Sequence, residues 1–256
     1  MTRDGVKRDT AALARATGNE RRKGRGAMPG DGKKRIAVLA GSPIGDLEWL
    51  RRELAAAAPE AVLCADGGAR YARLLGVVPD LIVGDLDSLT EELQRAFRDE
   101  GVAMDVYPAG KDETDTQLAL ERALAMGAGE ILVFGALGNR LDHTLANIGL
   151  LLLGRNRGAT VVLRDESCDV FAVTGEAVIR GEAGQTVSVF PLGGDAAGID
   201  LTGFEYPLVG AAMTLSRPYG ISNRLAATTG RIKVGEGSLL VIHYRRVVAL
   251  YENVGK

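Results

Sequence analysis

Cysteine and histidine are scarce in this 256-residue sequence, which has two of each. Cys64 and Cys168 stand far apart, each in an apolar stretch, so we expect two buried thiols rather than a disulfide or a zinc site. So few candidates also argue against a Ser/His/Asp triad or a Cys/His pair. Reduced cysteines favour a cytoplasmic location.

Long apolar runs and a large net charge are missing as well. No stretch reaches the ~18–20 apolar residues that span a bilayer, and the N-terminus lacks the apolar core of a secretory signal. With a net charge of −2, the chain lacks the excess of basic residues that is typical of nucleic-acid-binding proteins. We therefore expect neither a membrane nor nucleic acid among the partners.

The basic residues gather at the N-terminus. Residues 1–34 hold ten Lys/Arg and four Asp/Glu, a net of +6, which leaves −8 for the rest of the chain. This segment has many breakers and no sustained apolar face, so we expect a disordered basic tail. A solvated tail, or an extension upstream of a true start at Met28, is favoured over a nucleic-acid-binding arm.

From residue 34 to residue 164, short apolar runs alternate with helical patterns. This alternation predicts an α/β fold in which helices flank a parallel sheet. We expect strands at residues 34–40, 61–65, 80–83, 102–107, 130–134 and 160–164, and helices at residues 46–58, 69–75, 90–100, 114–126 and 141–153.

After about residue 165 the helical patterns stop, and short β-rich runs alternate with Gly-rich turns. That pattern is typical of an antiparallel sandwich or barrel. The expected strands are residues 170–173, 177–180, 186–191, 212–216, 231–234 and 238–244. We therefore predict a parallel-sheet domain at residues 35–165, followed by a smaller antiparallel β-sandwich domain at residues 166–256.

Polar residues follow the carboxyl ends of the expected α/β strands. Ligands of such sheets bind beyond these ends, so the residues should converge on one edge. They are Ser42, Asp66, the pair Asp85 and Asp87, the pair Lys111 and Asp112, and the loop 135–142. Their shared placement is stronger evidence for a site than any one motif.

Carboxylates dominate this edge. Asp85 and Asp87, two residues apart, would point to the same side if the extended strand geometry persists through them. Asp112 and Asp115, three apart, would share a face at the start of a helix. Each pair is also typical of a helix cap. Four carboxylates at one edge nevertheless favour a site for Mg²⁺, because like charges this close repel unless a cation lies between them.

The loop 135–142 (GALGNRLD) has features that suit an anion. Its glycines permit close approach of the backbone, and the following helix start favours negative charge. Arg140 offers a planar fork to phosphate, while Asp142 would hold that fork or join the metal ligands. Lys111 is placed to pair with phosphate oxygens. The loop matches neither a P-loop nor GxGxxG.

Five short motifs, taken in order, resemble those of thiamine pyrophosphokinases. They are Ala65-Asp66-Gly67-Gly68-Ala69, Gly84-Asp85-Leu86-Asp87-Ser88, Lys111-Asp112-Glu113-Thr114-Asp115, Arg140-Leu141-Asp142-His143 and Ser222-Asn223. The resemblance covers residues 35–245, nearly the whole chain apart from the tail. It implies a homodimer, with active sites between subunits, that transfers pyrophosphate from ATP to thiamine and releases AMP.

The resemblance also implies roles for individual residues. The Mg²⁺ ligands would be Asp85, Asp87 and Asp112, which together with Asp115 form the catalytic group. The nucleotide would be bound in the first domain by Asp66, Gly67, Lys111, Arg140 and Asp142. Thiamine would be bound by Ser222 and Asn223 of the β-rich domain, across the dimer interface.

Two positions depart from the family pattern. The residue before Arg140 is Asn139, where glycine is frequent, and the only tryptophan, Trp49, is far in sequence from Ser222. Tyr219 is the candidate to stack on thiamine instead. Three alternatives stay open: a different acceptor such as a hydroxymethylpterin, a non-catalytic nucleotide or thiamine sensor, and either Asp112 or Asp115 as the base.

Overall fold

The computed structural model describes residues 33–138 and 140–245. The expectations for the basic tail up to residue 32 and for Asn139 therefore fall outside the described residues. Within the described chain, the search for a helix long and apolar enough to cross a membrane finds none.

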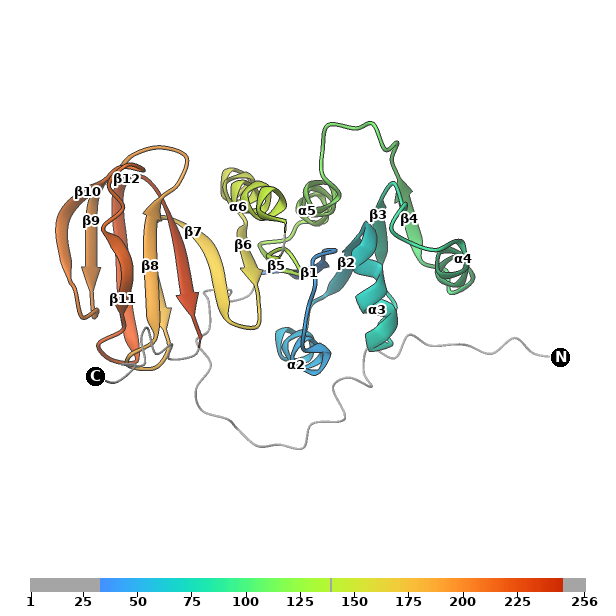
Figure 1. Ribbon diagram of the computed structural model, residues 1–256, viewed down its shortest axis with the longest axis horizontal. Helices are drawn as coiled ribbons and strands as arrows, with labels where there is room; N and C mark the ends of the chain where they lie inside the picture. The colour runs from blue at the N-terminus through green and yellow to red at the C-terminus, as the bar shows by residue number, and fades with distance from the viewer. Residues whose placement is uncertain (1–32, 139, 246–256) are drawn as a thin grey trace, which may run out of the picture.

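Parallel strands and helices make up the first half of the chain (Figure 1). The strands are β1 (Arg35–Leu39), β2 (Ala61–Ala65), β3 (Leu81–Gly84), β4 (Ala103–Val106), β5 (Glu130–Phe134) and β6 (Thr160–Arg164). Their order in the sheet is β4-β3-β2-β1-β5-β6. The chain winds to one side of β1 as far as β4 and then crosses to β5 on the other side. A reversal of this kind opens a crevice beyond the carboxyl ends of the strands, where α/β proteins bind ligands.

Helices cover both faces of these strands, which explains why β1 and β5 are nearly continuous apolar runs. One face carries α2 (Leu47–Ala57), α3 (Ala69–Leu75) and α4 (Glu91–Asp99), and the other carries α5 (Asp115–Ala125) and α6 (Leu141–Asn156). Trp49 and Phe97 belong to the buried cluster on the first face, and Leu120 and Leu151 to the cluster on the second.

Polar caps set the starts of three of these helices. Asp46, Thr90 and Thr114 precede α2, α4 and α5, and each side chain accepts a hydrogen bond from the backbone N–H three residues on. The sequence prediction placed these residues inside the helices, whereas the structure gives them the extended backbone of an N-cap. Thr114 thereby puts Asp115 in the first turn of α5.

The second half of the chain is built from antiparallel strands. They are β7 (Cys168–Arg180), β8 (Thr186–Pro191), β9 (Ala196–Thr202), β10 (Leu208–Met213), β11 (Gly220–Arg224) and β12 (Thr229–Tyr244). β12 pairs with β7 along its length, with β9 through its first half and with β8 through its second. β7 also pairs with β6, so the described strands belong to one mixed sheet. The proposed domain boundary at residue 165 falls between β6 and β7.

The fold class is confirmed, but the strand limits differ in the β-rich half. Residues 170–173 and 177–180 form one strand, as do residues 231–234 and 238–244. β10 lies earlier than the expected run 212–216, and β9 and β11 were not predicted. Glycines caused the false breaks, since Gly175 keeps its pairing with Val234 at a φ of 80°. A register shift between Val234 and Leu239 bends β12 without ending it.

Candidate active site

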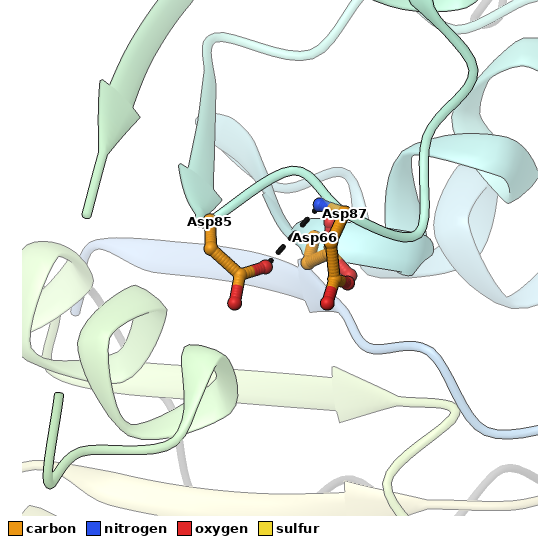
Figure 2. A group of neighbouring side chains, drawn as sticks. All are labelled: Asp66, Asp85 and Asp87. Atoms are coloured by element: carbon orange, nitrogen blue, oxygen red, sulfur yellow. Dashed lines mark hydrogen bonds between the residues drawn. The ribbon is translucent and has the colours of Figure 1, made fainter. Parts of the chain in front are cut away.

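Three aspartates meet at the carboxyl edge of the parallel strands. Asp66 follows β2, and Asp85 and Asp87 follow β3 (Figure 2). One carboxylate oxygen from each lies within 4.8 Å of the others. Asp66 is buried, Asp85 is partly buried and Asp87 is exposed, so the group leads from the protein interior to the surface. The expected convergence of carboxylates on one edge is thus found for these three.

Unusual backbone geometry brings them together. The extended geometry expected through Asp85 and Asp87 does not persist, because β3 ends at Gly84 and Leu86 has a left-handed φ of 64°. Leu86 is buried in the core, and the Asp87 N–H donates to Asp85 Oδ1 at 3.3 Å. Asp66 has a φ of 38°. Residues in this region other than glycine are strained and gather at functional sites.

Gly84 makes this close approach feasible. It has a φ of 149°, and a Cβ at this position would lie 2.9 Å from Asp66 Cβ and 3.0 Å from Asp115 Oδ1. The absence of a side chain therefore lets the chain after β2 and the start of α5 approach the end of β3. Gly84 itself was not predicted as a functional residue.

Lys111 joins the carboxylates from the loop between β4 and α5. Its Nζ lies 2.9 Å from Asp115 Oδ1 and 3.8 Å from Asp85 Oδ2, and its side chain is only 9% exposed. Burial by itself would lower the pKa of this ammonium, but the contact with Asp115 and the charges of Asp85 and Asp66 hold the pKa above its ordinary value. Lys111 therefore stays cationic. Asp112 is exposed and is not a member of the three-aspartate group.

Asp66 has an unmet requirement for a partner. Its Oδ1 is buried and has no hydrogen-bond partner among the described residues. Burial raises the pKa of this carboxyl, and the charges of Asp115 and Asp87 add to the rise, although hydrogen bonds from Ser88 and Gly67 oppose it. A divalent cation would meet this requirement, because hard cations take carboxylate oxygens and relieve the repulsion between them. The residues present therefore fit Mg²⁺.

The loop between β5 and α6 lies beside the end of β1. Gly135 has a φ of 66°, and a Cβ on Gly138 would lie 2.8 Å from Ser42 Cβ. Arg140 donates to both carboxylate oxygens of Asp142, with Nε 2.9 Å from Oδ1. This bond holds the pKa of Asp142 well below its usual range. In this structure Asp142 therefore holds the arginine fork and does not join the metal group.

Comparisons with known proteins identify the chain. Residues 52–163 match the model of the thiamin pyrophosphokinase catalytic domain, and residues 176–239 match its vitamin B1 binding domain. A thiamine pyrophosphokinase of Bacillus subtilis is 35% identical over 169 residues, which are 65% of this chain and 79% of that protein. The chain belongs to the thiamine pyrophosphokinase family. It is accordingly an enzyme of the thiamine diphosphokinase type.

Solved structures of the family agree with this fold. The thiamine pyrophosphokinase of Bacillus subtilis has a TM-score of 0.73 and 30% identity, over 83% of this chain and all of that one. The enzyme of Geobacillus thermodenitrificans has a TM-score of 0.70 and 31% identity, over 84% of this chain and all of that one. Both thiamine pyrophosphokinase domains are therefore represented in the described residues.

The predicted thiamine residues lie on β11, within the range of the vitamin B1 binding domain. Asn223 is buried, and its side-chain amide both donates to Tyr206 O and accepts from Tyr206 N. Ser222 is partly buried with a left-handed φ of 57°. Tyr219 is exposed, and its hydroxyl donates to Ala212 O. Asn223 thus fixes the backbone of Tyr206, a residue that is 67% exposed.

Proposed function

We propose that this member of the family transfers the pyrophosphate of ATP to the hydroxyl of thiamine in a Mg²⁺-dependent reaction, giving thiamine diphosphate and AMP. The observation that supports it most directly is the group of Asp66, Asp85 and Asp87 beside Lys111, whose side chain is largely covered. Clustered carboxylates with an unsatisfied buried oxygen fit a cation, and a neighbouring ammonium fits the phosphates that accompany it.

The metal ligands in this proposal are Asp85, Asp87 and Asp66. The family resemblance named Asp112 in place of Asp66, and Asp112 remains a candidate ligand from the exposed loop. Bound there, Mg²⁺ would neutralise charge on the ATP phosphates and help to orient them.

Cationic side chains and open backbone would hold the rest of the triphosphate. Lys111 contacts Asp85 of the three-aspartate group. The guanidinium of Arg140 lies at the start of α6, where Asp142 orients it. Gly67 is buried, and a Cβ there would lie 3.3 Å from Ser88 Cβ; its place in the nucleotide site rests on the family resemblance. These groups supply charge and position, which account for most of the acceleration in phosphoryl transfer.

The chemistry is a single displacement at phosphorus. The hydroxyl oxygen of thiamine forms a bond to the β-phosphorus, the bond from that phosphorus to the oxygen bridging to the α-phosphorus breaks, and AMP leaves with that oxygen. The hydroxyl proton passes to a carboxylate, Asp112 or Asp115. Asp112 lies next to Lys111 in the loop before α5, and Asp115 is the first residue of that helix.

We further propose a homodimer in which Ser222 and Asn223 hold thiamine across the subunit interface. Large exposed apolar side chains are candidates for that interface, since apolar side chains gathered on a surface mark interaction sites. They are Leu141 and Leu145 on α6, and Tyr206, Val209, Leu215, Tyr219 and Ile221 in the β-rich half. A cytoplasmic location is part of the proposal and is supported by the two buried free cysteines.

A coupled assay for AMP release tests the reaction. Full-length protein with ATP and Mg²⁺ should release AMP when thiamine is added. The release of AMP should stop when the metal is chelated. Release with a hydroxymethylpterin instead would identify the other acceptor. Release without any acceptor would identify a hydrolase, and binding of thiamine or ATP with no turnover would identify a sensor.

Substitution of the metal ligands tests the site separately. Asp85→Ala and Asp87→Ala should each lower kcat about 10²-fold or more, the scale seen when an electrostatic stabiliser is removed. Each should also weaken Mg²⁺ binding measured by calorimetry, while the exposed Asp99→Ala serves as the control. Near-normal turnover in both variants would falsify the metal assignment.

A further inference from the structure

The segment 40–46 between β1 and α2 lies at the point where the strand order reverses. Ser42 N donates to Gly135 O at 2.9 Å, which ties the segment to the loop between β5 and α6. On its other side, a Cβ on Gly41 would lie 3.8 Å from Gly67 Cα, next to Asp66. The segment therefore lies between the three-aspartate group and the Arg140 loop, beside the proposed ATP site.

The backbone N–H groups of this segment are nearly all engaged. Ile44 N donates to the Tyr71 hydroxyl at 3.0 Å, and that hydroxyl donates in turn to Ser42 O at 2.9 Å. Gly45 N and Asp46 N both donate to Glu166 Oε1, at 2.7 and 2.8 Å. Tyr71 of α3 and Glu166 of the turn after β6 thus fix segment 40–46, which has no regular secondary structure of its own.

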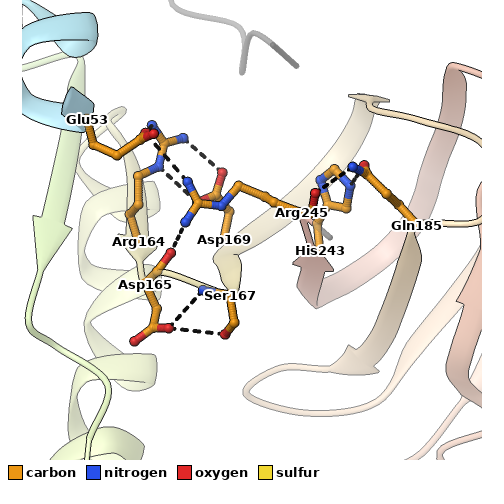
Figure 3. Close-up of polar contacts among 8 residues, drawn as sticks. All are labelled: Glu53, Arg164, Asp165, Ser167, Asp169, Gln185, His243 and Arg245. Carbon is orange, nitrogen blue, oxygen red and sulfur yellow. Dashed lines mark hydrogen bonds and ion pairs between the residues drawn. The ribbon is translucent and has the colours of Figure 1, made fainter. Parts of the chain in front are cut away.

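Glu166 belongs to a turn that is itself firmly held. Asp165 accepts hydrogen bonds from the backbone and hydroxyl of Ser167, which close the turn between β6 and β7 (Figure 3). On either side of it, Arg164 and Asp169 form a bidentate ion pair with contacts of 2.8 and 2.9 Å. Because this turn is already ordered, the Glu166 carboxylate loses little further conformational entropy when it accepts hydrogen bonds from the two N–H groups.

We infer that Glu166 is a positioning residue for the nucleotide: from the junction between the two halves, it holds segment 40–46 in the conformation that forms one wall of the ATP site. Tyr71 braces the same segment from α3. The inference rests on the proposed ATP site at this edge. A loosened wall weakens nucleotide binding in the ground state and in the transition state alike, so KM changes while kcat does not.

Steady-state kinetics of Glu166 variants test the inference. Glu166→Ala should raise the KM for ATP about tenfold, the effect of losing hydrogen bonds worth about 1.4 kcal/mol, with kcat and the KM for thiamine near wild type. Glu166→Gln should restore most of the affinity, because an amide oxygen accepts the same two N–H groups. Glu48→Ala, which removes an exposed carboxylate from the first turn of α2, is the matched control.

Tyr71→Phe provides an independent arm, since it removes the hydroxyl that bonds Ser42 and Ile44. A similar rise in the KM for ATP, with the melting temperature close to wild type, supports the inference. An unchanged KM in Glu166→Ala overturns it. So does an equal loss for both substrates with a lowered melting temperature, which would indicate a merely structural role. Turnover by the wild type tests the proposed function itself, so the two failures are distinguishable.

Discussion

At the scale of single residues, the site depends on positions where the backbone is strained. Asp66 and Leu86 occupy the left-handed region, which costs a residue with a side chain about 1–3 kcal/mol. Burial of Leu86 offsets that strain, because its side chain fills the core beneath the turn. The flanking aspartates are thereby left at the edge of the sheet. The hydrophobic core thus helps to hold the backbone conformation of the site, in addition to the contacts that Lys111 makes with Asp85 and Asp115.

Gly84→Ala tests how tightly this arrangement is packed. The new methyl group would lie 2.9 Å from Asp66 Cβ and would require a φ of 149°. We expect a loss of stability of about 2–3 kcal/mol, as for overpacking at a strained position, together with a large loss of kcat. Urea denaturation and AMP release measure the two effects.

Gly110→Ala is the control for this change. Gly110 lies in the loop before Lys111, and a Cβ there would meet nothing within 4 Å. Its stability should stay within about 0.5 kcal/mol of wild type. Equal effects of the two substitutions would contradict the steric role of Gly84.

At the scale of elements, the sequence was informative wherever local chemistry decides the structure. Buried parallel strands are continuous apolar runs, so β2, β5 and β6 were predicted with their observed limits. Glycine misled the prediction in the β-rich half, because it interrupts the apolar pattern whether the strand ends or only bends. β9 and β11 were missed because Gly198, Asp200 and Ser222 dilute their apolar pattern.

The site was predictable to the level of the sheet edge and no further. The rule that ligands lie beyond the carboxyl ends of strands brought Asp66, Asp85, Asp87 and Lys111 together. Distances depend on turn conformations, and those depend on Gly84 and on the left-handed Leu86. The same rule applied to β6 would have pointed to Asp165 and Glu166, the two residues that follow that strand.

The start of α6 allows a prediction that separates binding from stability. Arg140 and Asp142 are 68% and 63% exposed, and exposed pairs of this kind contribute about 0–1 kcal/mol. Arg140→Ala should therefore leave the melting temperature nearly unchanged while raising the KM for ATP several-fold. Arg157→Ala, at the exposed far end of the same helix, should change neither. A KM unaffected by Arg140→Ala would remove this residue from the phosphate site.

At the scale of the whole molecule, the two halves share one sheet and one buried ion network. Arg164 of β6 contacts Asp169 of β7 and Glu53 of α2 (Figure 3). Arg245, the residue after β12, also contacts Glu53. Burial opposes the charge of Arg164, but Asp169 and Glu53 hold the pKa of its guanidinium above the ordinary value. Arg245 also lies over the Trp49 ring, 5.4 Å from its centre. The network thus joins α2 of the catalytic half to the last strand of the β-rich half.

Breaking this network should destabilise both halves together. Among the described residues, Arg164→Leu would leave the buried Asp169 with the 3.8 Å contact to Arg245 as its remaining ion pair, and breaking a buried pair costs about 3–5 kcal/mol. Arg73→Leu is the matched control, because its pair with Glu100 is exposed and should contribute less than about 1 kcal/mol. Calorimetry should show one transition at a lower temperature for Arg164→Leu. Two separated transitions would mean that the halves unfold independently, and a loss as small as that of the control would show that the network does not couple them.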